Sequence, residues 1–234
     1  MSTERRRPSL GLVKNEALSY LRLGLLAPAA GRLPANETST AKLGVLFVPG
    51  VGANGSQFLS MRRALEPQVR WFDSFEYSSL GDLRRIAHRL KSHLGQTASR
   101  CERLVVVGHS LGGFLLQLAL SAEDAPDHVA GFASICAPLH GTWRSRLAPH
   151  PGLRALRPDS ELLADIGRRR HRLSRLEGRL LTVGARHDQF IEPHTSAFLD
   201  GAESLELSDV AHAGSLFDDR VHQAVARLVE RAAR

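Results

Sequence analysis

The most specific chemical pattern in the chain is the sequence G-H-S-L-G at residues 108–112. It follows an apolar run at 103–107 and precedes a segment with helical spacing at 112–123, which places a serine at a strand-to-helix turn. In such a turn the hydroxyl of Ser110 projects above the sheet, and the flanking glycines let the two backbones approach closely. Ser110 is therefore a candidate nucleophile that would form a covalent intermediate.

A serine hydroxyl needs a base to remove its proton, and the base needs an acid to orient it. In folds with this turn the groups follow in the chain order serine, acid, histidine, and the last two stand after later strands. Asp188 follows the apolar run 179–183, and His212 follows the run 203–207 in a loop before the final helical segment. We therefore expect Ser110, Asp188 and His212 to act together.

Other titratable residues compete for the roles of base and acid. Two of the competing histidines, His194 and His222, fall inside helical patterns, which direct a side chain less readily toward the end of a strand. The competing bases are His109, His187, His194 and His222, and the reserve acids are Asp165 and Asp209.

The loop after the first apolar run, residues 48–55 (V-P-G-V-G-A-N-G), is rich in glycine. Glycines permit the backbone turns that direct N–H groups inward, and an oxyanion that develops during acyl transfer needs such donors. We expect the N–H groups of Leu111 and Val51 to supply them, with Gly50 and His109 beside them in the substrate-binding site. Neither G-x-G-x-x-G nor the Walker pattern occurs here, so a nucleotide is not expected.

Short apolar runs alternate with segments of helical spacing from residue 43 onward. Runs rich in Val, Leu, Ile and Phe are typical of strands buried on both faces, and this alternation predicts a mostly parallel sheet of about six strands in a single α/β domain, with helices on both faces. In such sheets the reactive groups gather at the carboxyl ends of the strands. The expected strands are 43–48, 69–75, 103–107, 129–136, 179–183 and 203–207, and the expected helices are 56–66, 80–95, 112–123, 194–200 and 215–232.

Two stretches depart from this alternation. Residues 139–178 are much longer than a plain crossover, which predicts an excursion that forms a wall or lid over a pocket. Residues 1–42 form an N-terminal segment before the domain at 43–234, with an amphipathic helix expected at 17–27. That helix would pack on the domain or contact a membrane surface.

Charge and composition narrow the classes of protein. The 234 residues are 43% hydrophobic, an ordinary value for a globular protein, and the net charge of +7 is carried mainly by arginine. Peripheral contact with an anionic membrane would use this charge, whereas no nucleic-acid motif accompanies it.

Charged residues such as Lys14 and Arg22 interrupt the N-terminal apolar pattern, so we expect neither an export signal nor a membrane-spanning helix, and we expect a cytoplasmic or membrane-peripheral protein. The two cysteines form no disulfide framework, and no metal-ligand spacing occurs, so no metal or cofactor is expected.

Several segments together resemble the lipases and esterases of the α/β-hydrolase superfamily, and most of all its small bacterial triacylglycerol-lipase-like group. The resemblance covers roughly residues 43–232 and is carried by the loop PGVGANG at 49–55, GHSLGG at 108–113, CAPLHGT at 136–142, Asp188, and HAGSL at 212–216. The chain has Pro49-Gly50 where this family often has His-Gly, and the family's secreted lipases carry an export signal.

The resemblance implies an α/β-hydrolase fold with a catalytic triad at Ser110, Asp188 and His212 and oxyanion donors at Val51 and Leu111. It also implies that the segment 138–142 borders the acyl site and that 157–163 is an excursion helix. The expected activity is hydrolysis of a small-molecule or lipid carboxylic ester. A thioesterase, an amidase or an acyltransferase would use the same triad, and a protein that only binds a ligand in the pocket is a further alternative.

Overall fold

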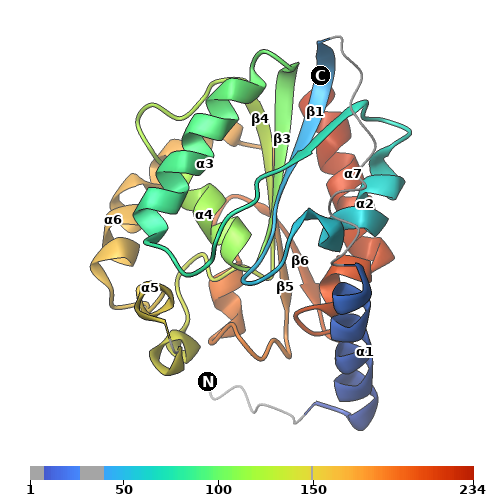
Figure 1. Cartoon of the computed structure of the whole chain (residues 1–234), viewed down its shortest axis with the longest axis vertical. Coiled ribbons are helices and arrows are strands. Elements are labelled where there is room, and N and C mark those ends of the chain that lie inside the picture. Colours follow the sequence, from blue (N-terminus) through green and yellow to red (C-terminus); the bar gives the residue numbers. More distant parts are fainter. Residues whose placement is uncertain (1–7, 27–39, 149) are drawn as a thin grey trace.

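Six strands form one parallel sheet at the centre of the computed structural model, which describes residues 8–26, 40–148 and 150–234 (Figure 1). The strand order is β2-β1-β3-β4-β5-β6, and every neighbouring pair is parallel. This confirms the expected class of sheet. The strands are β1 (Ala41–Val48), β2 (Trp71–Ser74), β3 (Cys101–His109), β4 (Val129–Ile135), β5 (Leu180–Ala185) and β6 (Glu203–Leu207).

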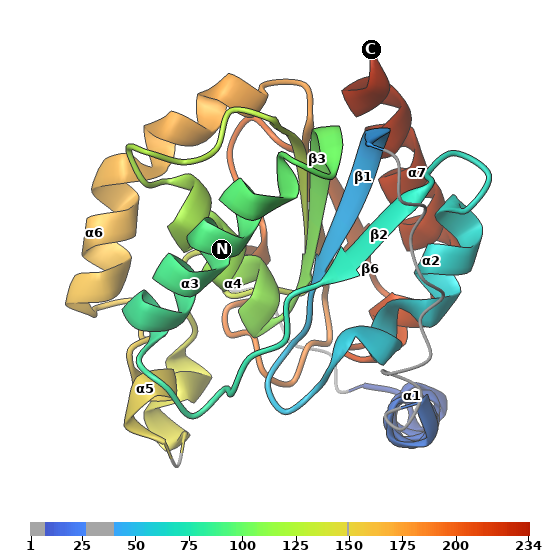
Figure 2. The same cartoon turned by 45° about the horizontal axis from the view of Figure 1, so that its top comes forward.

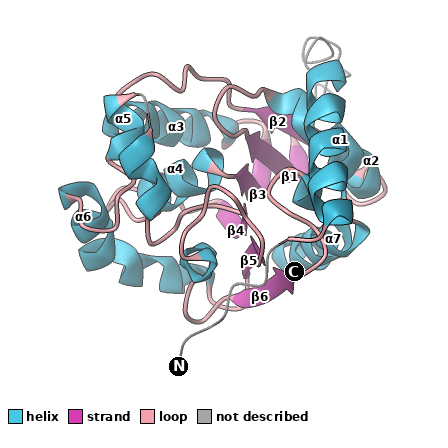
Figure 3. Cartoon of the chain, turned by 90° about the horizontal axis from the view of Figure 1, so that it is seen from below, coloured by secondary structure: helices cyan, strands magenta, loops and turns pink. Residues whose placement is uncertain are grey.

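The strand register brings the carboxyl ends of the central strands to one edge of the sheet. Val48 of β1 pairs with Gly108 of β3, and Gly108 pairs with Ser134 of β4. Residues along β4 and β5 are buried without exception, as expected for strands covered on both faces. The loops that follow these strands therefore meet at that edge, which Figure 3 views directly.

Helices cover both faces of the sheet and enclose one apolar core on each side (Figures 1 and 2). The first face carries α3 (Leu83–Thr97), α4 (Leu111–Leu120) and α6 (Glu161–Arg169). The second carries α2 (Leu59–Leu65) and α7 (Asp219–Ala233). The side chain of Asp82 accepts the N–H of Arg85 and so begins α3, whose apolar positions then face the sheet as their spacing predicts.

Helix α1 (Leu10–Leu26) begins earlier than the helix expected at 17–27, and its predicted last residue lies outside the described residues. Leu12 and Ser19 are buried against the domain, whereas Leu10 is 91% and Leu25 81% exposed. In Figure 3, α1 and α5 (Pro151–Arg154) stand on opposite sides of the sheet edge. Among the described helices, none combines the length and the apolar character that crossing a membrane requires.

The helix expected at 194–200 is wrong, because only the 3-10 turn His194–Ala197 forms there. Phe198 then adopts an extended conformation, and its ring occupies the space beside Gly184, so packing against β5 ends the turn. The excursion 139–178 contains α5, α6 and the two 3-10 segments Trp143–Leu147 and Arg170–Leu176.

Candidate active site

Ser110 occupies the turn between β3 and α4 in a backbone conformation that side chains rarely adopt, with φ 53° and ψ −123°. Such strain in a residue other than glycine is concentrated at functional positions. The turn depends on its glycines: a Cβ on Gly108 would lie 2.5 Å from the backbone nitrogen of Gly113, and one on Gly112 would overlap the carbonyl oxygen of Val48. No larger residue fits either position without movement of the backbone.

Asp188 lies in the turn after β5 and uses both carboxylate oxygens. Oδ1 accepts the N–H groups of Phe190 at 2.8 Å and Ile191 at 3.0 Å, which fixes the carboxylate. Oδ2 lies 2.7 Å from Nδ1 of His212, and both side chains are buried. The structure therefore brings together the acid and the base that the sequence predicts.

His212 lies in the loop after β6 and is oriented by its surroundings. Burial lowers the pKa of His212, but the charge and hydrogen bond of Asp188 and the charge of Glu16 outweigh this, and the net effect raises the pKa. Because Nδ1 faces the carboxylate and donates to it, Nε2 is the basic nitrogen of the neutral ring. The ring edge of Phe190, with centroids 5.0 Å apart, packs on the imidazole.

Ser110 and His212 line one cavity of about 530 Å³, within the usual size range of small-molecule sites. Its walls are largely apolar, and many of their side chains come from α1, the excursion and the loop after Asp188. Tyr20 and Leu23 belong to α1, and Ile191 follows the acid. The excursion contributes Leu147, Leu153 and Leu156, so it forms a wall of the cavity.

The predicted oxyanion donors also border this cavity. Val51 and Leu111 line it, and their N–H groups donate to no described residue. The loop that carries Val51 is held by two side chains that no sequence motif signals. The hydroxyl of Tyr77 donates to the carbonyl of Pro49 at 2.7 Å, and the hydroxyl of Ser79 accepts the N–H of Gly52 at 2.9 Å.

Gly50 and His109 lie beside these donors and also line the cavity. A Cβ on Gly50 would lie 3.2 Å from the ring of His109 and from Cβ of Ser110, so the loop passes close to the nucleophile because residue 50 has no side chain. His109 is buried, and burial together with the neighbouring His212 holds its pKa well below the usual range. The ring is therefore neutral.

The other competing bases and the reserve acids lie outside this cavity. None of His187, His194 and His222 lines the cavity, and His222 donates to the carbonyl of Leu216 at 2.8 Å. Asp165 pairs with Arg84 and Asp209 with Arg220.

Thr142 joins the excursion to the loop of the acid. Its hydroxyl donates to the carbonyl of Phe190 at 2.7 Å and accepts the N–H of Glu192 at 2.9 Å. Pro138 and Thr142 line the cavity, as the resemblance implied for the segment 138–142. Glu16 and Gln189 also contact the site, and no motif in the sequence signals them.

Within the described residues, one cluster of three side chains could offer ligand atoms to a metal ion. It consists of Cys136, Asp188 and His212, whose ligand atoms lie within 4.8 Å of one another. Burial raises the pKa of the Cys136 thiol well above its usual range, and a neutral thiol is a poor metal ligand. Asp188 and His212 are already bonded to each other. The donor set therefore suits an acid–base pair better than a metal ion.

Comparison with known proteins shows which family and which solved structures the chain is similar to. The family described as "Alpha/beta hydrolase family" matches residues 45–232, whereas no curated protein sequence matches the chain. The mature lipase BlEst2 of Bacillus licheniformis has a similar structure (TM-score 0.64, 14% identity, 84% of this chain and 96% of that one). The same holds for a structure of LipS and LipT, described as metagenome-derived lipolytic enzymes (0.61, 18%, 85% and 99%). The esterase Pf2001 of Pyrococcus furiosus is a third example (0.57, 12%, 83% and 84%).

Proposed function

The chain belongs to the alpha/beta hydrolase family, and on that premise we propose that it is a serine hydrolase that cleaves carboxylic esters through an acyl-enzyme on Ser110. The observation that carries the proposal is the 2.7 Å contact between Nδ1 of His212 and Asp188, made beside a cavity that Ser110 also lines. The nucleophile Ser110, the orienting acid Asp188 and the base His212 then follow one another in the chain order serine, acid, histidine.

In the first half-reaction Nε2 of His212 takes the hydroxyl proton of Ser110 as the oxygen attacks the acyl carbonyl. Asp188 keeps the imidazole in the required tautomer and stabilises the imidazolium that forms. The N–H groups of Val51 and Leu111 donate to the developing oxyanion. His212 then protonates the departing alcohol, which leaves the acyl group on Ser110.

In the second half-reaction a water molecule replaces the alcohol. His212 takes a proton from the water, the resulting nucleophile attacks the acyl carbonyl, and the same proton returns to Ser110 as the carboxylic acid leaves. Every step uses side chains and backbone N–H groups of the chain itself.

The apolar cavity favours a substrate with a hydrocarbon acyl group, either a small-molecule ester or a lipid ester. Its leucines come mostly from the excursion, and burying a methylene among them contributes about 0.8 kcal/mol. Three proteins of similar structure are a lipase, lipolytic enzymes and an esterase, which supports the same class of substrate. A thioester, an amide or a second acyl acceptor would use the same groups.

The experiment that tests this function is the initial rate of hydrolysis across p-nitrophenyl esters from short to long acyl chains, with Ser110→Ala as the matched blank. We expect wild-type turnover with a preference along the series and a loss of at least about 10³-fold in the variant. Equal rates in both proteins would refute the role of Ser110. If the wild type hydrolyses no ester but does hydrolyse a thioester or amide series, the leaving group is a thiol or an amine and the mechanism is the same.

A further inference from the structure

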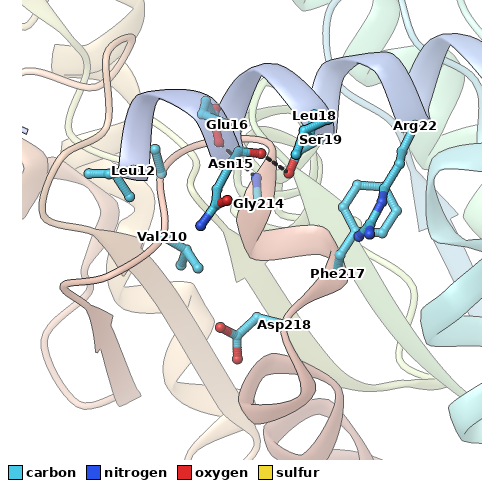
Figure 4. A pocket seen from close by; sticks show the side chains of 11 residues that line it. Leu12, Asn15, Glu16, Leu18, Ser19, Arg22, Val210, Gly214, Phe217 and Asp218 are labelled. Atoms are coloured by element: carbon cyan, nitrogen blue, oxygen red, sulfur yellow. Dashed lines mark hydrogen bonds between the residues drawn. The ribbon is translucent and has the colours of Figure 1, made fainter. Parts of the chain in front are cut away.

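Helix α1 makes a polar contact with the loop that carries His212. The carboxylate of Glu16 accepts two successive backbone N–H groups there, that of Ala213 at 2.7 Å on Oε1 and that of Gly214 at 3.0 Å on Oε2. Figure 4 shows Glu16 on α1 facing Gly214, beside a cavity of about 210 Å³ between the helix and this loop. Ala213 and Gly214 are the two residues directly after the base His212.

The same carboxylate reaches the loop that carries the acid. The side-chain amide of Gln189, the residue after Asp188, donates to Oε1 of Glu16 at 2.9 Å and to the hydroxyl of Tyr20 at 3.1 Å. One side chain on α1 therefore links the loop after β5 to the loop after β6. Hydrogen bonds to a carboxylate are roughly twice as strong as those between neutral groups, so this link is stronger than an ordinary loop contact.

Helix α1 also forms part of the cavity wall through Tyr20 and Leu23. The helix lies outside residues 45–232, the part of the chain that matches the family. A segment outside the matched region thus touches the acid loop, the base loop and the substrate cavity at once.

We propose that Glu16 is a positioning residue, which holds the loops of Asp188 and His212 at a fixed spacing and so keeps the imidazole aligned with Ser110. This inference rests on the proposed function of those three residues. The hydrogen bonds from Ala213 and Gly214 to Glu16 tether the loop of the base to α1. Because a displacement of about 1 Å in a reacting group can lower a rate by about 10²-fold, this tether has a direct effect on turnover.

The charge of Glu16 gives the tether a second measurable effect. Among the described residues, the titratable groups that face His212 are Asp188, His109, Cys136 and Glu16. Two of them are carboxylates: Asp188 belongs to the triad, and Glu16 lies on α1. Its negative charge favours the protonated imidazole. Removal of that charge moves the ionisation of His212 to lower pH, which a purely structural contact would not do.

The test compares Glu16→Gln with Glu230→Gln, which makes the same charge change at an exposed position of α7. We expect Glu16→Gln to lower kcat by roughly 10- to 100-fold with little change in KM, and to move the low-pH limb of activity downward. Glu230→Gln should match the wild type in both. A kcat and pH limb in Glu16→Gln equal to those of Glu230→Gln would overturn the proposal.

Amide hydrogen exchange over residues 211–216 tests the tether without reference to turnover. We expect faster exchange in Glu16→Gln than in Glu230→Gln. If the wild type hydrolyses no ester but this protection depends on Glu16, the proposed function fails and the tether stands. Faster exchange with unchanged kcat would overturn the positioning role. Should Glu16→Gln not fold, Gln189→Ala breaks the link to the acid loop alone, and an unchanged kcat there would overturn the proposal.

Discussion

The rings of His109 and His212 lie with their centroids 4.7 Å apart, and Nε2 of His109 donates to the backbone carbonyl of His212 at 3.3 Å. The residue before the nucleophile thus helps to hold the loop that carries the base. With its pKa well below the usual range, His109 keeps this role as a neutral donor across the working pH range.

Replacement of His109 by phenylalanine keeps a ring in place and removes that donor. We expect a loss of about 1 kcal/mol in the free energy of unfolding and a severalfold fall in kcat, because among the described residues the carbonyl of His212 then keeps one donor, the hydroxyl of Ser215 at 2.7 Å. Urea unfolding and ester turnover measure the two effects. His171→Phe, which removes an exposed histidine next to the carbonyl of Arg168, is the control and should change neither.

The pH dependence of turnover follows from the state of His212. Turnover needs the neutral imidazole, and the pKa of His212 is raised above 6.5, so activity should fall on acidification with a midpoint above that value. A profile of kcat/KM against pH measures it. Asp188→Asn removes the charge that most raises this pKa, so its midpoint should move downward while kcat falls by about 10⁴-fold. A midpoint that stays in place would contradict the assignment of this limb to His212.

The close packing of the turn at Ser110 predicts that one added methyl group lowers both stability and turnover. In Gly112→Ala the new Cβ would overlap the carbonyl oxygens of Val48 and Pro49, and we expect the free energy of unfolding to fall by about 3 kcal/mol together with turnover. Gly95→Ala, where nothing lies within 4 Å on α3, should instead stabilise the protein by up to about 1 kcal/mol. Similar urea midpoints for both variants would show that the turn is less tightly packed.

The wall that the excursion contributes predicts a change in acyl-chain preference. Leu153 is half-buried and lines the cavity, so Leu153→Trp should lower turnover of long-chain esters by about tenfold and spare the shortest ones. Leu80→Trp places the same ring at an exposed position outside the cavity lining and serves as the control. A uniform loss across the series in Leu153→Trp would mean that the acyl group lies elsewhere.

Contact with an anionic membrane stays a prediction. The outer side of α1 exposes Leu10, Leu21 and Leu25, and Lys14 lies on the same helix. We expect more protein to sediment with anionic than with neutral lipid vesicles, and less with both in the double variant Leu21→Gln, Leu25→Gln. Equal partitioning onto both lipids would exclude the electrostatic contribution.

Residues of local motifs were predictable, because the chemistry restricts both their type and their spacing. The position of Ser110 follows from its glycines, and those of Asp188 and His212 from the ends of two apolar runs. Glu16 was not predictable in this way, because in the sequence it is one charge in an N-terminal helical pattern. Its contact with Ala213 joins residues 197 positions apart, and no local pattern encodes such a pairing. The same holds for Gln189 and Tyr77.

The strand order has a consequence for how the molecule loses function. Ser110 follows β3 in the interior of the sheet, whereas His212 follows β6, which is largely exposed and, among the described strands, pairs with β5 alone. We expect fraying of this edge to separate the base from the nucleophile while the interior strands stay paired. Local opening of this kind requires less free energy than global unfolding. We therefore expect activity to be lost before the sheet comes apart, because Ser110 stays in place on β3 while its base is displaced.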